Sequence, residues 1–167
     1  MDGGRMLPVQ EEGVMSTATT QLLTAEEYFA LPEPMDGSKQ ELVRGRVVTV
    51  PGPGVEHGEI QVNVASAIKV FLKSNPIGRV VTESGAITER KPDTVRGPDV
   101  SYYSKERLPL DKRVVGYHTE VPDLCVEVMS PFNSLKQLKA KAKEYLFAGV
   151  RMVWIIDPEE RTVTIIT

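Results

Sequence analysis

Hydrophobic and polar residues recur with two different periods along this chain, and these periods predict where strands and helices lie. Short apolar or alternating runs between turn residues are typical of β-strands, whereas apolar residues three and four apart are typical of amphipathic helices. Strands are predicted at residues 40–44, 46–50, 79–83, 85–90, 98–103, 123–129, 150–157 and 162–167. Helices are predicted at residues 57–73 and 135–148.

Cap and turn residues define several of these boundaries. Thr24 and Glu27 form a capping box, which predicts a short helix that is ended by two prolines. Gly45 separates two strand segments and predicts a β-hairpin. Gly149 is expected to cap the C-terminus of the second long helix.

The order of these elements indicates one domain with a mixed sheet. Residues 1–20 lack periodicity and are predicted to be a disordered tail, so residues 21–167 form the domain. One helix lies between the buried strands 123–129 and 150–157, which predicts an α/β fold of the α+β type, a mixed β-sheet flanked by helices. The first long helix is expected to bury one face, made of Ile60, Val64, Ile68, Phe71 and Leu72. The second is expected to bury a face made of Leu135, Leu138, Ala142, Tyr145 and Leu146.

A glutamate interrupts the most apolar strand. Residues 124–129 are apolar at every position except Glu127. A lone buried carboxylate costs several kcal/mol unless it is protonated, paired or bound to a metal. Glu127 therefore needs partners, and the candidates are Asp99, which follows Pro98 before another strand, and Lys141 on the next helix.

Each candidate also has a plain structural interpretation. Lys141 borders the buried helix face, so alone it is best read as a lysine that covers apolar surface with its stem. Asp99 alone is best read as an aspartate that caps a turn, but the three residues together favour a site. Asp123 competes with Asp99, but it should lie about 13 Å from Glu127 along the strand and is interpreted as structural. His118, in the charged loop 104–120, is expected to be solvated.

Composition excludes several classes of protein. The 167 residues carry 20 basic and 23 acidic side chains, a net charge of −3, which argues against attachment to nucleic acid by bulk charge. No apolar run reaches the roughly 20 residues of a membrane span, and no signal peptide is recognisable. The single Cys125 fits a reducing compartment, so a cytoplasmic location is expected. Two histidines and one cysteine cannot build the usual zinc site, and no phosphate-binding glycine motif or nucleophile elbow occurs.

The order of the motifs resembles the Uma-two family of restriction-endonuclease-like proteins, in the PD-(D/E)XK nuclease superfamily. The resemblance covers about residues 24–167 and rests on an ordered set of short motifs. These are Glu41-Leu42-Val43-x-Gly45-x-Val47-Val48, His57, Pro98-Asp99-Val100, Pro122-Asp123-Leu124-x-Val126-Glu127-Val128-x-Ser130-Pro131, Lys141-x-x-x-Tyr145 and Gly149-Val150-x-x-x-Trp154-x-x-Asp157-Pro158.

The resemblance implies a restriction-endonuclease-like core of four strands flanked by helices, with an N-terminal β-hairpin. It also implies a site at which Asp99, Glu127 and the carbonyl of Val128 hold Mg²⁺, for which Mn²⁺ can substitute. Lys141 matches the helix lysine that replaces the usual lysine two residues after the second acid, a position taken here by Met129. Glu41 matches an acid that completes such sites, and His57 a family histidine of unsettled role.

The activity implied is metal-dependent endonuclease cleavage of nucleic acid, with DNA the expected substrate and 5′-phosphate and 3′-hydroxyl ends the expected products. A homodimer is expected, because one site cuts one strand. Two alternatives stay open, an inactive nuclease fold that serves as a binding or assembly module and a phosphodiesterase for small substrates. Basic residues available for a nucleic-acid backbone are Arg44, Arg46, Lys105, Arg107, Lys112 and Arg113.

The chain departs from the family pattern in two places. Gln137 stands where the family often has an acid four residues before the helix lysine. Family members also continue past the position of Thr167 with further strands, so the resemblance implies that the domain is truncated at this end.

Overall fold

The computed structural model describes residues 22–36 and 38–167, and the tail predicted at residues 1–20 lies outside them. In this part of the chain the helices are α1 (Ala25–Phe29), α2 (Val55–Ser74) and α3 (Leu135–Phe147). The strands are β1 (Lys39–Val43), β2 (Arg46–Val50), β3 (Gly78–Thr82), β4 (Ala86–Glu89), β5 (Thr94–Arg96), β6 (Val100–Ser104), β7 (Leu124–Val128), β8 (Met152–Asp157) and β9 (Thr162–Ile166). All predicted helices and strands are present, and β5 is an addition.

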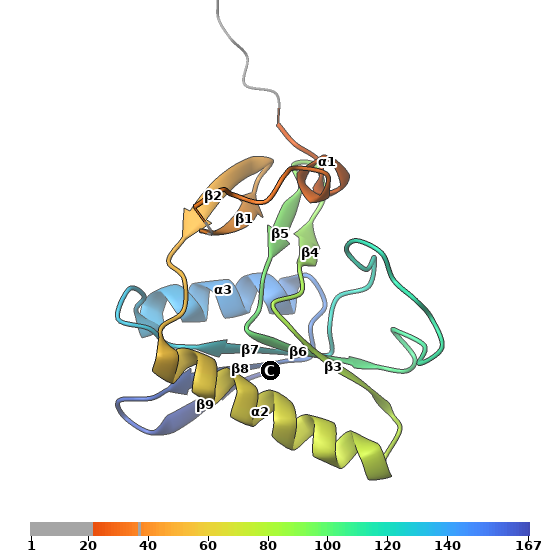
Figure 1. Ribbon diagram of the computed structural model, residues 1–167, viewed down its shortest axis with the longest axis vertical. Helices are drawn as coiled ribbons and strands as arrows, with labels where there is room; N and C mark the ends of the chain where they lie inside the picture. Colours follow the sequence, from red (N-terminus) through yellow and green to blue (C-terminus); the bar gives the residue numbers. More distant parts are fainter. Residues whose placement is uncertain (1–21, 37) are drawn as a thin grey trace, which may run out of the picture.

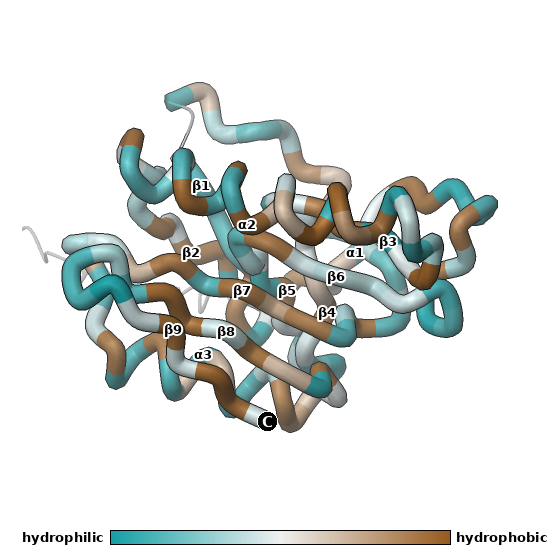
Figure 2. Tube along the Cα trace, turned by 90° about the horizontal axis from the view of Figure 1, so that it is seen from below, coloured by the Kyte–Doolittle hydropathy of each residue, from teal (hydrophilic) through white to brown (hydrophobic). Residues whose placement is uncertain are grey.

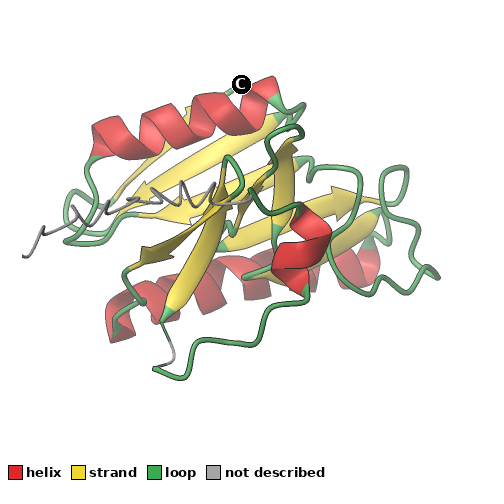
Figure 3. Ribbon diagram, turned by 90° about the horizontal axis from the view of Figure 1, so that it is seen from above, coloured by secondary structure: helices red, strands yellow, loops and turns green. Residues whose placement is uncertain are grey.

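A five-stranded sheet in the order β3-β6-β7-β8-β9 forms the centre of the fold. The pair β7 and β8 is parallel and the other neighbours are antiparallel, so the sheet is mixed as predicted. It has one strand more than the four that the resemblance implied. Helix α3 joins β7 to β8 and covers one face, while α2 crosses the other face (Figures 1 and 3). The resulting three layers bury β7 on both faces.

A smaller antiparallel sheet, in the order β2-β1-β5-β4, stands beside α1 above the larger sheet in Figure 1. Its hairpin β1–β2 turns through Arg44 and Gly45, which both have positive φ. A side chain at Gly45 would approach Leu22 Cβ to 2.6 Å, so glycine is needed there for space as well as for φ. Strand β5 was not predicted, because it has only three residues and one apolar position, Val95.

The apolar core lies between α3 and the centre of the larger sheet. Tyr145 and Ala142 of α3 are fully buried against Cys125, Val153 and Ile155 of β7 and β8. Figure 2 shows the same concentration of hydrophobic positions along these two strands. The buried face predicted for this helix is therefore confirmed.

The other long helix differs from its predicted pattern. Phe71 of α2 was expected to be buried but is 56% exposed, whereas Gln61 is buried. Gln61 faces polar groups at the ends of β3 and β6, and its amide donates hydrogen bonds to Glu83 and to the backbone oxygen of Asp99. Satisfied hydrogen bonds allow a polar side chain to take a buried position that hydrophobic periodicity assigns to an apolar residue.

The loop that follows β6 is held by buried polar contacts, and two predictions about it are wrong. His118 is buried rather than solvated, with Nε2 2.8 Å from the carbonyl oxygen of Arg107 and its ring edge-on to Tyr103. Arg107 donates to the carbonyls of Val121, Pro122 and Gly149 and pairs with Asp123. Its guanidinium is used by the fold and is not available for a nucleic-acid backbone.

A buried carboxylate fastens α1 to the smaller sheet and gives a stability prediction. Asp93 accepts hydrogen bonds from the backbone N–H groups of Ala25 and Lys91 and from Arg90. Burial opposes its charge, but these donors hold the pKa of Asp93 below its usual value. Asp93→Asn should lower the free energy of unfolding by about 1–3 kcal/mol at neutral pH, as measured by urea denaturation.

The same contact predicts a pH dependence. Because the folded pKa of Asp93 is depressed, its stabilisation is present above the unfolded pKa near 3.9 and is lost as the pH falls through the folded value. The difference in stability between wild type and Asp93→Asn should therefore shrink as the pH falls below about 4. Asp111→Asn, at an exposed loop position, is the control. A constant difference down to pH 2 would contradict this role.

Candidate active site

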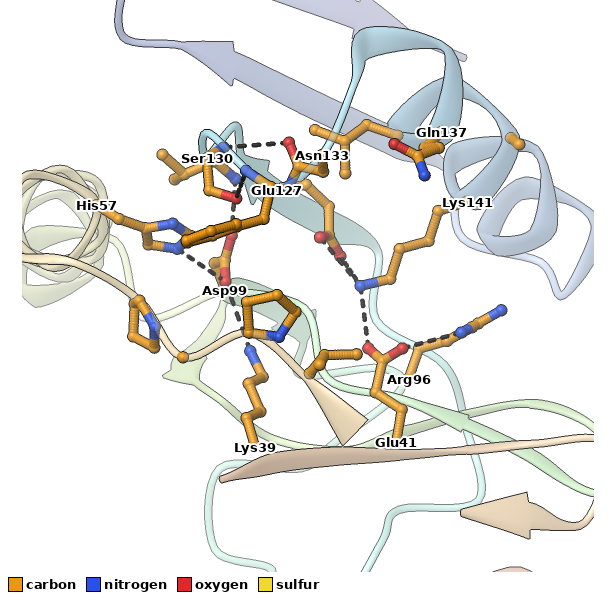
Figure 4. A pocket seen from close by; sticks show the side chains of 18 of the residues that line it. Lys39, Glu41, His57, Arg96, Asp99, Glu127, Ser130, Asn133, Gln137 and Lys141 are labelled. Atoms are coloured by element: carbon orange, nitrogen blue, oxygen red, sulfur yellow. Dashed lines mark hydrogen bonds and ion pairs between the residues drawn. The ribbon is translucent and has the colours of Figure 1, made fainter. Parts of the chain in front are cut away.

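A pocket of about 470 Å³ opens where the two sheets meet (Figure 4). The smaller sheet contributes residues of β1, β2 and β5, and the larger sheet contributes the residue directly before β6 and the end of β7. The first turn of α2 and residues 137–144 of α3 form further parts of the walls. Its charged and imidazole side chains are Lys39, Glu41, His57, Arg96, Asp99, Glu127, Lys141 and Glu144.

Asp99 lies on the floor of this pocket, directly before β6, and is 4% exposed. Its Oδ2 accepts a hydrogen bond of 2.7 Å from the backbone N–H of Val128 on the neighbouring strand. Its Oδ1 lies 3.1 Å from Nε2 of His57 and 3.7 Å from Nζ of Lys39. Burial opposes the charge, but His57, the Val128 N–H and Lys39 hold the pKa of Asp99 below its usual range.

Glu127 points from β7 into the same pocket and is 5% exposed. Its oxygens lie 2.9 and 3.0 Å from Nζ of Lys141. The hydroxyl of Tyr145 donates a further hydrogen bond of 2.7 Å to Oε1. Burial raises the pKa of Glu127, because desolvation outweighs Lys141 and the charge of Asp99 adds to the effect. Of the two partners predicted for this buried acid, Lys141 contacts it directly and Asp99 lies in the same pocket.

Lys141 joins two carboxylates that belong to different sheets. Besides Glu127, its Nζ contacts Oε1 of Glu41 on β1 at 3.0 Å. Burial opposes the ammonium charge, but the two carboxylates raise the pKa of Lys141 well above its usual value. Glu41 also accepts from Arg96 and from the N–H of Gly97, and its pKa stays below the usual range despite burial.

Sequence reasoning missed a second set of charged residues around the pocket. Arg96 of β5 bridges Glu41 and Glu144 at 2.9 and 2.8 Å. Lys39 begins β1 and lies between Asp99 and Glu83, a residue just after β3. No local pattern distinguished these residues, since their partners are far away in the sequence. The Tyr145 position was recognised as buried, but its hydroxyl contact with Glu127 was not.

The structure brings all five candidate side chains, Glu41, His57, Asp99, Glu127 and Lys141, to the lining of one pocket. Asp123 does not line it. This carboxylate accepts from the N–H of Ser104 and pairs with Arg107 and Arg151, in keeping with its structural interpretation. The remaining basic candidates Arg44, Arg46, Lys105, Lys112 and Arg113 do not line the pocket either.

The donor atoms of the pocket suit a hard divalent cation. Within residues 22–36 and 38–167, no three His, Cys, Asp or Glu side chains are grouped to hold a metal by themselves. Two carboxylates and a carbonyl are present instead. The Val128 N–H points at Asp99, and the carbonyl of a strand residue lies on the same side as its N–H. Oxygen donors of this kind match Mg²⁺, which keeps several waters and needs few protein ligands.

Comparisons with known proteins agree with this fold. A crystal structure described as "a putative nuclease belonging to DUF820 from Anabaena variabilis" superposes with a TM-score of 0.73 at 27% sequence identity. The match covers 86% of this chain and 79% of that chain. No curated protein matches the sequence. None of the helices in the described part of the chain is long and apolar enough to cross a membrane.

The resemblance recognised in the sequence is also confirmed. The model of the Uma2 family, described as "Putative restriction endonuclease", matches residues 25–167, which is well over half of the chain. Both the family and the solved neighbour are thus described as nucleases. The chain belongs to the Uma2 family.

Proposed function

We propose that this protein is a metal-dependent endonuclease that hydrolyses phosphodiester bonds of DNA. The observation that carries the proposal is the placement of Lys141 against Glu127 and Glu41, in the pocket that also holds Asp99. The two acids, Asp99 directly before β6 and Glu127 on β7, offer oxygen ligands to a divalent cation, and the buried lysine offers a positive charge to a phosphate, which suits metal-dependent phosphodiester hydrolysis. The nuclease descriptions of the family and of the solved neighbour support the same activity.

The residues of the pocket divide into two functions. Asp99, Glu127 and the carbonyl of Val128 would hold Mg²⁺ or Mn²⁺, which polarises a phosphate and lowers the pKa of a bound water. Lys141 supplies a permanent positive charge that stabilises the charge developing on the phosphate oxygens and orients the attacking water. In the reaction the water oxygen bonds to phosphorus, the bond to O3′ breaks, and a proton passes to O3′.

Glu41 and Arg96 position Lys141 rather than react. Glu41 draws the ammonium toward the smaller sheet, and Arg96 fixes Glu41 by a hydrogen bond of 2.9 Å. His57 lies beside Asp99 on the opposite wall, and its contact raises the pKa of the imidazole. One pocket of this kind cuts one strand, so cleavage of a duplex is proposed to use a homodimer.

The proposal is tested by incubating the protein with supercoiled plasmid in Mg²⁺, in Mn²⁺ and in chelator. Wild type should nick or cut the plasmid only with metal. Asp99→Asn should lose this activity, because it removes a carboxylate charge from the floor of the pocket. Asp111→Asn removes an exposed acid outside the pocket and should cut like the wild type. Absence of cleavage by folded wild type in either metal would refute the proposal.

A second candidate, a phosphodiesterase for small substrates, is favoured by the charge of the pocket. Four carboxylates line it, those of Glu41, Asp99, Glu127 and Glu144, against three permanent cations, Lys39, Arg96 and Lys141. This balance gives no excess positive charge for a long polyanion. If the protein hydrolyses bis(p-nitrophenyl) phosphate but leaves plasmid DNA uncut, the small-substrate phosphodiesterase is the better assignment.

A further inference from the structure

A second lysine approaches the pocket from the side opposite Lys141. Nζ of Lys39 lies 2.6 Å from Oε2 of Glu83 but 3.7 Å from Oδ1 of Asp99. The ammonium is thus bound by the carboxylate at the rim and only approaches the carboxylate on the floor. Figure 4 shows Lys39 directed toward Asp99 from β1. The side chain of Glu83 is 38% exposed and does not line this pocket, so a direct contact with substrate does not explain its position.

Glu83 is held in position by both its backbone and its side chain. Its φ is +53°, in the left-handed region that non-glycine residues adopt at a cost of about 1 kcal/mol or more. The side chain of Gln61 donates to Oε1 of Glu83 at 2.9 Å and to the backbone oxygen of Asp99 at 2.8 Å. One buried amide therefore fixes the distance between the rim carboxylate and the backbone of the floor residue.

We propose that Glu83 is a positioning residue that holds the ammonium of Lys39 away from Asp99, so that Lys39 does not compete with a divalent cation for Oδ1, which Nε2 of His57 also approaches at 3.1 Å. The inference rests on the proposed function, since it concerns the metal site of that reaction. No local pattern in the sequence marks Glu83 or Lys39 for this role.

The physical basis of this role is competition between the ammonium of Lys39 and a divalent metal ion for Oδ1 of Asp99. If the charge of Glu83 is removed, the carboxylate that Lys39 still contacts is Asp99. A charge-assisted N–H···O contact then closes to about 2.8 Å, and the ammonium occupies a lone pair that a metal ion needs. Changes of residues that support metal ligands typically alter metal affinity by about 10–100-fold. Glu83→Gln should weaken the metal by that factor, while its amide oxygen keeps the contact with Gln61.

The experiment is a calorimetric titration of Mn²⁺ into the full-length protein without nucleic acid. It compares the wild type with Glu83→Gln, Lys39→Met and the double variant. Glu83→Gln should raise the Kd for Mn²⁺ about 10-fold or more. Lys39→Met should bind Mn²⁺ at least as tightly as wild type, because the competing ammonium is gone. The double variant should match Lys39→Met, which a merely structural role of Glu83 does not predict.

Each contrary outcome is informative. An unchanged Kd in Glu83→Gln, with Mn²⁺ binding intact in wild type, overturns this inference and leaves the proposed nuclease standing. Weaker binding in Lys39→Met, or a double variant as weak as Glu83→Gln, shows that Lys39 does not compete and also overturns it. Wild type that binds no Mn²⁺ removes the metal site and with it both proposals. Thermal unfolding of all four proteins establishes that each is folded.

Discussion

Glu127→Gln is expected to reduce the rate of metal-dependent cleavage by at least about 10²–10³-fold while the fold stays intact. Glu127 is the acid of the central strand β7, and loss of one electrostatic contact at a reacting centre typically reduces the rate by a factor of this size. Stability should change little, because Lys141 keeps its contact with Glu41 and the amide can still accept from Tyr145. Single-turnover cleavage of a labelled oligonucleotide and urea denaturation measure the two effects.

The sign of the pH dependence gives this prediction a second readout. Burial raises the pKa of Glu127, so its ionisation is less favourable in the folded than in the unfolded chain. The corresponding stability is present at low pH and is lost as the pH rises through the folded pKa. The Glu127→Gln variant has no carboxyl group to ionise at this position. Its free energy of unfolding, relative to that of the wild type, should therefore rise with pH. Near-normal cleavage by this variant would place the reacting centre elsewhere.

Lys141→Met should affect the fold far more than Glu127→Gln. Removing the ammonium leaves Glu41 and Glu127 buried without their shared cation. Breaking a buried ion pair from one side costs about 3–5 kcal/mol, which should be visible as a fall in the free energy of unfolding at neutral pH. Cleavage should fall by at least about 10²-fold as well, since the charge that stabilises the phosphate is gone.

The double variant Lys141→Met/Glu127→Gln separates the two consequences. Glu41 keeps its contact with Arg96, so removing the charge of Glu127, which loses its cation in Lys141→Met, should restore a large part of the lost stability but none of the activity. Lys143→Met, on the exposed side of the same helix, controls for the loss of a lysine. Equal stability of Lys141→Met and Lys143→Met would mean that the ion pairs across the pocket contribute nothing to the fold.

Most of the fold could be predicted from the sequence because its elements satisfy local rules. The capping box of Thr24 and Glu27, the hairpin glycine and the apolar run of β7 are where they were expected. Predictions failed where distant partners decide the structure. Strand β5 exists because β1 and β4 pair with it on both sides, and Gln61 is buried because polar atoms of other segments receive it.

The candidate site followed from one residue whose surroundings conflict with its charge. Glu127 is conspicuous in an apolar strand, and that conflict pointed to Asp99 and Lys141. Arg96 and Glu83 carry no such local conflict, because both lie in polar segments where charged residues are ordinary. Arg96 and Glu83 meet their partners only when the smaller sheet packs against the rest of the fold. The spacing of hydrophobic residues along the chain carries no information about such long-range contacts.

The division of the pocket between two sheets has a consequence for thermal inactivation. Lys39, Glu41 and Arg96 come from the smaller sheet, which has the smaller apolar cluster and an exposed edge strand, β2. Parts of a protein with few buried contacts open before the whole chain unfolds. Cleavage activity should thus be lost on heating at a lower temperature than the main transition in far-ultraviolet circular dichroism. The difference between the two temperatures would then report the separation of the smaller sheet from the larger one.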